Sequence, residues 1–126
     1  MRVLIVDDDP DDRFLIREAL ARGGFEVVQA GSAEEGFRIA RESAPDALLA
    51  DTNMPRMGGL ELIGRLRGEP AMRGVPMLLM SSTAQGPDAD AAEAAGVTLL
   101  RKPLLEAEYL EFAQALRATL AHAKEV

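Results

Sequence analysis

The chain has 126 residues, 48% of them hydrophobic, which suits one globular domain with its own core and leaves no room for a second domain of ordinary size. It has no cysteine and one histidine, which excludes a disulfide framework, a thiolate or multi-histidine metal site and a cysteine nucleophile. The net charge of −7 disfavours direct binding to nucleic acid or an anionic membrane. There is neither a signal peptide nor an apolar run near the roughly 18 residues of a membrane span, so a cytoplasmic location is expected.

Short apolar runs alternate with helical patterns along the chain. The expected order is strand Val3–Val6, helix Asp12–Gly23, strand Phe25–Val28, a helix from a Ser32 cap to before Pro45, strand Ala47–Ala50, helix Gly59–Arg67, strand Met77–Met80, helix Pro87–Ala95, strand Val97–Leu100 and helix Leu105–His122. Three of the strands are continuously apolar, as in central parallel strands covered on both faces, and Phe25–Val28 is typical of an edge strand. Strict alternation predicts an α/β fold, a doubly wound five-stranded parallel sheet with five helices.

The helix boundaries are predicted from caps and breakers. Gly23 and Gly24 end the first helix, and Ser32 with Glu35 forms a capping box at the start of the second. In the fourth helix a proline opens the first turn and Gly96 follows the last.

Polar residues follow the predicted strands at the point where each strand ends. They are Asp7-Asp8-Asp9, Asp51, Ser81-Ser82-Thr83 and Arg101-Lys102-Pro103. Ligands of such sheets bind beyond the carboxyl ends of the strands, so these side chains are expected to converge. Converging carboxylates repel one another unless a cation joins them, and hard oxygen ligands favour Mg²⁺. A hydroxyl and an ammonium beside them would cradle phosphoryl oxygens, which predicts phosphoryl transfer with a carboxylate as a candidate acceptor.

Four segments together resemble the receiver domain of two-component response regulators, whose fold is like that of the chemotaxis regulator. They are VLIVDDDPDDR, PDALLADTNMPRMGGLEL, VPMLLMSS and GVTLLRKPL. Asp51 and Ser81 are 30 residues apart, and Ser81 and Lys102 are 21 apart. The resemblance covers essentially the whole chain and implies a single receiver domain over residues 1–126, with the flavodoxin-like strand order 2-1-3-4-5.

The resemblance implies a role for each candidate site residue. Asp51 would accept a phosphoryl group from a histidine kinase or a histidine phosphotransfer protein. Asp8 would bind Mg²⁺ directly, Asp7 through water, and Asp51 and the backbone carbonyl of Asn53 would complete the metal site.

The resemblance also implies that two further residues act on the phosphoryl group itself. Ser81 would move toward it and donate a hydrogen bond, and Lys102 would pair with its oxygens. The Lys102–Pro103 peptide bond would be cis, which ordinary X-Pro frequencies would not suggest.

The same resemblance implies a regulatory switch and not a conventional enzyme, although it would catalyse its own phosphorylation from small donors and its own dephosphorylation. The expected readout is a changed surface over residues 87–95, 97–100 and 105–122, directed at a downstream protein whose identity stays open. Dimerisation through this surface is left open too. The chain is expected to act as a stand-alone regulator without an output domain.

Three positions depart from the family pattern. Gly58 replaces the aspartate that often precedes the loop glycine, and Ser81 replaces the commoner threonine but keeps the donor. Leu99 stands where an aromatic residue or histidine is usual, which puts the family's aromatic-rotamer readout in doubt. An interaction module whose switch no longer operates is therefore a second hypothesis.

The acidic run at residues 7–12 permits other interpretations. Asp7 and Asp9 resemble the paired aspartates of haloacid-dehalogenase-like phosphatases, and the spacing of Asp7, Asp9, Asp11 and Glu18 imitates an EF-hand. The structural alternative is that Asp9, Asp11 and Asp12 are solvated acids that start a helix. Without the five aspartates of this run and Asp51 the net charge would be −1, so most of the excess acidity is local.

Overall fold

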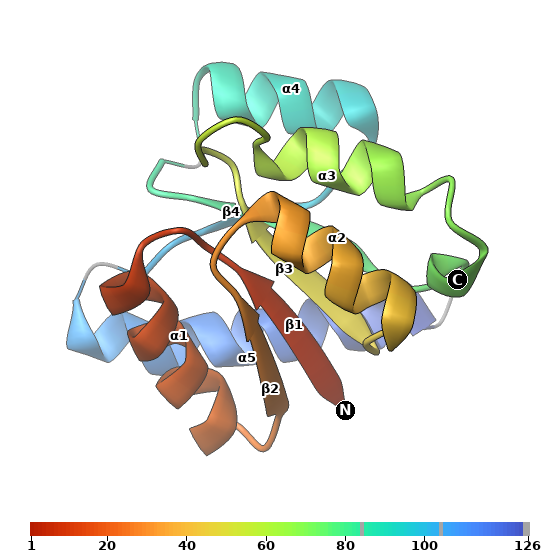
Figure 1. The fold of residues 1–126 in the computed structure, drawn as a ribbon. Helices are drawn as coiled ribbons and strands as arrows, with labels where there is room; N and C mark the ends of the chain where they lie inside the picture. Colours follow the sequence, from red (N-terminus) through yellow and green to blue (C-terminus); the bar gives the residue numbers. More distant parts are fainter. Residues whose placement is uncertain (84, 104, 125–126) are drawn as a thin grey trace.

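The computed structural model describes residues 1–83, 85–103 and 105–124 of the chain and shows alternating strands and helices (Figure 1). In chain order the elements are β1 (Arg2–Val6), α1 (Pro10–Arg22), β2 (Glu26–Ala30), α2 (Ala33–Glu42), β3 (Ala47–Asp51), α3 (Gly59–Leu66), the 3₁₀ helix η1 (Pro70–Met72), β4 (Met77–Ser81), α4 (Pro87–Ala95), β5 (Leu99–Arg101) and α5 (Glu106–Lys124). The strands pair in parallel in the order β2-β1-β3-β4-β5. This order confirms the predicted fold class and the edge position of the second strand.

Helices cover both faces of the sheet, and each face has its own hydrophobic core. The alternation within β1 shows the division, because Val3 and Ile5 pack with α1 and α5 while Leu4 and Val6 pack with α2 and α3. Every residue of β3 is buried, as the continuously apolar run predicted. In the part of the chain that the structure describes, no helix is long and apolar enough to cross a membrane.

Several element boundaries differ from the sequence prediction by one or two residues, and hydrogen bonding explains two of the shifted starts. Helix α1 starts at Pro10 instead of Asp12, because the Asp9 side chain caps it by accepting from two backbone N–H groups. Strand β5 starts at Leu99 instead of Val97, because the Val97 N–H donates to the Ala92 carbonyl and completes the cap of α4.

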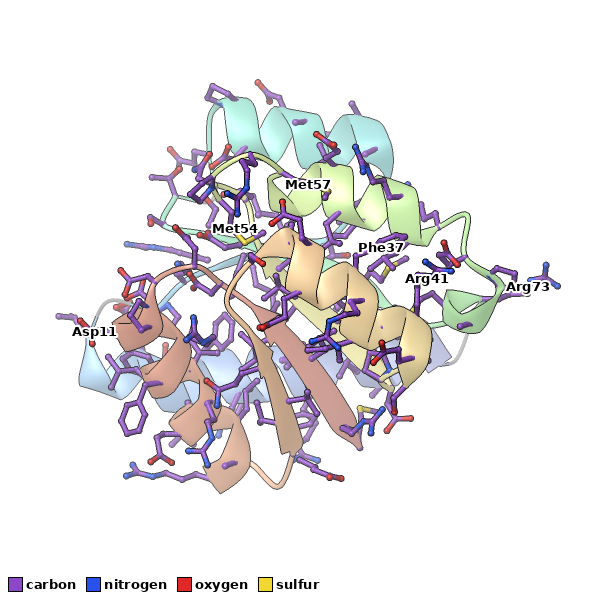
Figure 2. The ribbon with its side chains drawn as sticks, in the orientation of Figure 1. Asp11, Phe37, Arg41, Met54, Met57 and Arg73 are labelled. Atoms are coloured by element: carbon purple, nitrogen blue, oxygen red, sulfur yellow. The ribbon has the colours of Figure 1, made fainter. Side chains whose placement is uncertain are left out.

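The segment between β3 and α3 folds tightly over the end of the sheet. Figure 2 shows Met54 and Met57 in this segment; Met57 is buried in the core on the α2–α3 face, and Met54 packs against that core. Helix α3 starts so close to β3 that a Cβ atom at Gly59 would collide with the Asp51 carbonyl oxygen and lie 2.8 Å from Leu79 Cδ2. Glycine at this position therefore fixes how the end of β3 is held.

Two glycine substitutions in α3 are expected to have opposite effects. Gly59→Ala should lower the free energy of unfolding by about 1–3 kcal/mol, because the backbone of Asp51 cannot give way cheaply. Gly64→Ala, at an exposed helical site with nothing within 4 Å of the new Cβ, should raise it by up to about 1 kcal/mol. Urea denaturation followed by circular dichroism measures both, and equal stability of the two variants would contradict the close approach.

Candidate functional site

The carboxyl ends of four strands bring their polar residues to one edge of the sheet. Asp7 directly follows β1, and its N–H donates to the Ala30 carbonyl at 3.1 Å. Asp51 and Ser81 are the last residues of β3 and β4. Lys102 follows β5, and its N–H continues the ladder to the Ser81 carbonyl at 2.7 Å. The convergence follows directly from the parallel topology.

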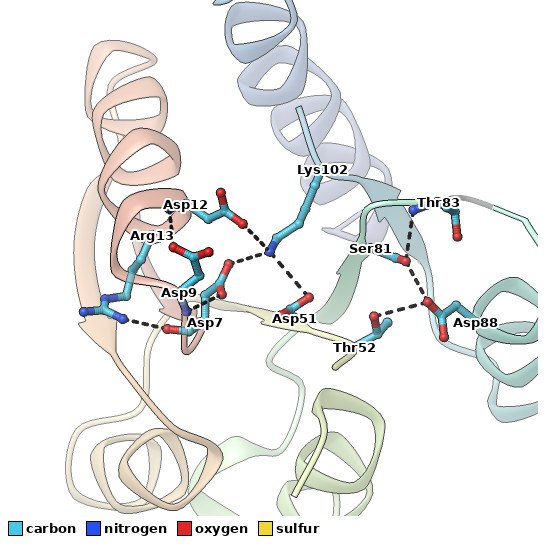
Figure 3. Close-up of polar contacts among 10 residues, drawn as sticks. All are labelled: Asp7, Asp9, Asp12, Arg13, Asp51, Thr52, Ser81, Thr83, Asp88 and Lys102. Carbon is cyan, nitrogen blue, oxygen red and sulfur yellow. Dashed lines mark hydrogen bonds and ion pairs between the residues drawn. The ribbon is translucent and has the colours of Figure 1, made fainter. Parts of the chain in front are cut away.

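The ammonium group of Lys102 is the centre of this edge. Its Nζ atom lies 2.8 Å from Asp7 Oδ2, 3.0 Å from Asp12 Oδ2 and 3.6 Å from Asp51 Oδ1 (Figure 3). The Lys102 side chain is only 8% exposed, so these contacts are poorly screened by solvent. One cation thus joins residues 7–12 and Asp51, two parts of the chain that are remote in sequence from each other and from Lys102.

Burial and the excess of acid shift the pKa values of the group in one direction. Burial raises the pKa of Asp51 to about 6, and the charges of Asp7 and Asp8 add to it, although Lys102 and the Asn53 N–H oppose the rise. Burial also raises the pKa of Asp7, and the close Lys102 ammonium group and the hydrogen bond from the Asp9 N–H offset the rise in part.

The same excess of carboxylates also shifts the pKa of Lys102. Burial opposes the charge of Lys102, but the close carboxylates of Asp7 and Asp12 and the charge of Asp51 outweigh burial, and the pKa of the ammonium group is raised. Lys102 therefore stays charged while the carboxylates around it remain in electrostatic excess.

Three carboxylates at this edge could hold a metal ion. One oxygen each from Asp7, Asp8 and Asp51 lie within 4.8 Å of one another. Asp7 Oδ2 is buried and, although close to Lys102, receives no well-directed hydrogen bond. A buried oxygen with unused acceptor capacity beside two further carboxylates fits a hard divalent cation such as Mg²⁺. Metal coordination by the Asn53 carbonyl stays a prediction.

Ser81 belongs to a second polar network on the other side of Asp51. Its hydroxyl donates to Asp88 Oδ2 of α4 at 2.8 Å, and its oxygen accepts from the Thr83 N–H at 3.2 Å. Thr52, the residue after Asp51, also donates to Asp88 Oδ2, at 3.3 Å. In Figure 3 the dashed lines form two separate groups, one around Lys102 and one around Asp88.

The convergent acids, lysine and serine coincide with a known family pattern. The sequence model of the response regulator receiver domain matches residues 3–114. The chain belongs to this family. As a receiver domain it is part of a class of regulatory switches found in two-component systems.

The receiver domain is similar to both short and longer proteins. It is 36% identical over 115 residues to an uncharacterized 14.6 kDa protein in the sodA1 3′ region of Leptolyngbya boryana, covering 90% of this chain and 88% of that protein. It is 36% identical to the transcriptional regulatory protein PrrA of Mycobacterium tuberculosis, covering 91% of this chain and 49% of PrrA, so it spans about half the length of that relative.

A solved structure supports the same assignment. The Vibrio cholerae chemotaxis protein CheY4 superposes with a TM-score of 0.79 at 27% identity, with 97% of each chain covered.

Two polar contacts at this edge of the sheet were not predicted from the sequence. Asp12, interpreted as a solvated helix-start acid, instead pairs with Lys102 across 90 residues of sequence. Nothing in the sequence pattern distinguishes Asp88, which accepts the hydrogen bond from Ser81. Both aspartates lie in the first turn of a helix, where favourable interaction with the helix dipole already explains an acid. Only the packing of α1 and α4 beside the strand ends reveals the additional role.

Three sequence expectations need correction or narrowing. The described residues contain no cis peptide bond, so the expected cis Lys102–Pro103 bond is wrong; the trans form is the intrinsically favoured one, and Lys102 reaches the carboxylates with it. The EF-hand spacing forms no calcium loop, because Asp11 and Glu18 lie within α1. The Asp9 Oδ1 atom caps α1, a structural role that accounts for an acid at this position without the phosphatase hypothesis.

The raised pKa of Asp51 predicts a pH-dependent stability difference. Its pKa lies above the ordinary 3.8, so ionisation of this carboxyl lowers the free energy of unfolding above pH 6. The loss disappears as the pH falls below 4, because the carboxyl becomes protonated in both the folded and the unfolded state. In EDTA, Asp51→Asn should therefore raise the free energy of unfolding by roughly 2–3 kcal/mol at pH 7.5, and the gain should vanish near pH 3.5. Urea titrations across this range measure it.

The matched control is Asp11→Asn, which removes an exposed negative charge from the nearby first turn of α1. It should give no gain of this size. A pH-independent gain in Asp51→Asn, or an equal gain in Asp11→Asn, would contradict the burial argument.

Proposed function

We propose that this receiver domain is a phosphoacceptor switch in which Asp51 takes a phosphoryl group from a histidine kinase or a histidine phosphotransfer protein in the presence of Mg²⁺. The observation that carries the proposal is the contact of Lys102 Nζ with the carboxylates of Asp7 and Asp51 at the edge where Asp8 also converges. A nucleophilic carboxylate, a fixed cation and a set of hard oxygen ligands are the requirements of phosphoryl transfer to an aspartate.

The chemistry requires Asp51 in its ionised form. One carboxylate oxygen of Asp51 attacks phosphorus, and the bond from phosphorus to the histidine nitrogen breaks as the nitrogen keeps the electron pair. An acyl phosphate is formed, and no oxidation occurs. With a pKa of about 6, Asp51 is mostly ionised at neutral pH. Every residue of β3 is buried, so water has little access to this end of the strand.

The negative charge of the carboxylates at this edge explains why the site needs cations. A phosphoryl group arriving with a negative charge meets Asp7, Asp8 and Asp51, against which Lys102 alone is insufficient. Asp7, Asp8, Asp51 and the Asn53 carbonyl would hold Mg²⁺, which when bound neutralises carboxylate charge and polarises the phosphoryl oxygens. Lys102 would then exchange its contact with Asp51 for one with a phosphoryl oxygen while Asp7 and Asp12 keep it in place.

The proposed output is a changed α4–β5–α5 surface presented to a downstream protein or a second copy of the domain. Ser81 would give up its hydrogen bond to Asp88 and bind the phosphoryl group instead, and the start of α4 would change position as a result. Leu99 is partly buried and packs against the core on the α2–α3 face. An aliphatic side chain therefore occupies the position where the family usually has an aromatic residue or histidine. The switch would therefore depend on polar contacts. Action as a single domain over residues 1–126 stays part of the proposal.

Phosphorylation with a small donor tests the function directly. Incubation with acetyl phosphate and Mg²⁺ should give one phosphoryl adduct by intact mass, which should be lost in strong acid or base because an acyl phosphate is a mixed anhydride that hydrolyses readily. Asp51→Asn and chelation of the metal should each abolish the adduct. Asp11→Asn, which changes an exposed acid on α1, should leave it unchanged.

An adduct that persists in Asp51→Asn would place the acceptor elsewhere. Absence of any adduct, together with a partner whose affinity ignores phosphorylation and Mg²⁺, would favour the alternative of a passive interaction module.

A further inference from the structure

The single proton of the Ser81 hydroxyl group is engaged in the structure. Ser81 is 1% exposed, donates its proton to Asp88 Oδ2 at 2.8 Å and accepts the Thr83 N–H at 3.2 Å. A serine hydroxyl has a single proton, so it can donate to one acceptor at a time. Donation to Asp88 and donation to a phosphoryl group on Asp51 are therefore mutually exclusive.

Asp88 links the strand ends to helix α4. It is the second residue of the helix and is half-buried, and its Oδ2 atom accepts from both Ser81 of β4 and Thr52, which follows Asp51 (Figure 3). Both bonds have the same carboxylate oxygen as acceptor, but the bond from Ser81 is short at 2.8 Å, whereas the bond from Thr52 is 3.3 Å long. Loss of the Ser81 bond would leave Asp88 with the weaker of these two contacts.

We propose that Asp88 is a positioning residue that holds the Ser81 hydroxyl, and with it the first turn of α4, in the unphosphorylated arrangement. This inference rests on the proposed function. A phosphoryl group on Asp51 brings about −1.5 to −2 charges and strong acceptor oxygens, so it competes with Asp88 for the Ser81 proton. When Ser81 changes partner, α4 loses its short bond to β4, and the state of Asp51 reaches the α4 surface without an aromatic residue at position 99.

Beryllofluoride with Mg²⁺, a mimic of the phosphoryl group, tests the competition. Its affinity is measured by NMR titration of backbone amides in the wild type, Asp88→Ala, Ser81→Ala and the double variant. Asp88→Ala should bind on the order of tenfold more tightly, because Ser81 no longer has a bond to give up. In the Ser81→Ala background the same substitution should give no gain. An equal gain in both backgrounds would mean that only charge removal matters, and would overturn the proposal.

Two further variants separate geometry from charge. Asp90→Ala removes an exposed acid from the same first turn of α4 and should leave the affinity unchanged. Asp88→Asn keeps an acceptor oxygen in the same shape, so its gain should be smaller than that of Asp88→Ala. A gain in Asp90→Ala as large as that in Asp88→Ala would contradict a specific role for Asp88.

Amide hydrogen exchange of the unliganded protein separates this inference from the proposed function. Asp88→Ala and Ser81→Ala should each speed exchange of the α4 amides several-fold, because both remove the bond between Ser81 and Asp88. The double variant should add little to Asp88→Ala, which already removes this bond and the longer one from Thr52. Coupling in exchange without beryllofluoride binding by the wild type would overturn the phosphoacceptor function. Binding by the wild type without coupling would overturn the role of Asp88 alone.

Discussion

The ammonium group of Lys102 joins acids that would otherwise push the edge of the sheet apart. Asp7 follows β1, Asp12 lies in α1 and Asp51 ends β3, and each has a carboxylate within 3.6 Å of the same nitrogen. The balance is incomplete, because one cation faces more than one buried negative charge. Burial raises the pKa values of Asp7 and Asp51, and the neighbouring acids add to this rise, whereas the pKa of Lys102 is raised by the same acids against the effect of burial. A site of this kind sacrifices stability in the free protein and gains affinity for cations.

The two polar networks divide the work at the strand ends. The network around Lys102 gathers the groups that would meet a phosphoryl group and a metal ion, and the network around Asp88 connects the neighbouring strand ends to α4. Asp51 and Thr52 are adjacent in the chain, so β3 enters both networks. The close packing of Gly59 against the Asp51 carbonyl holds this junction from the α3 side. A change in charge at Asp51 therefore acts next to a hydrogen-bonded contact with α4.

Much of the architecture could be predicted because its determinants are local or periodic. Apolar runs of strand length, the Ser32–Glu35 capping box and the glycine after α4 each act within a few residues, and the observed elements follow them. Parallel topology then forces the strand ends together, which is why Asp7, Asp51 and Lys102 could be expected at one edge. The boundaries of α1 and β5 moved where a cap or a single backbone hydrogen bond decided between neighbouring starts.

By itself the sequence determined the alternation of strands and helices, the acidic character of the sheet edge and the residue types available there. The tertiary structure alone decided which of the many acids face Lys102 and which cap a helix. Asp9 and Asp12 are three residues apart in one acidic run, yet Asp9 caps α1 while Asp12 reaches a lysine 90 positions away. The same holds for Asp88, which meets Ser81 through the approach of α4 to β4. Local preference admits an acid at every helix start, and only the packing of the helix against the sheet determines what that acid contacts.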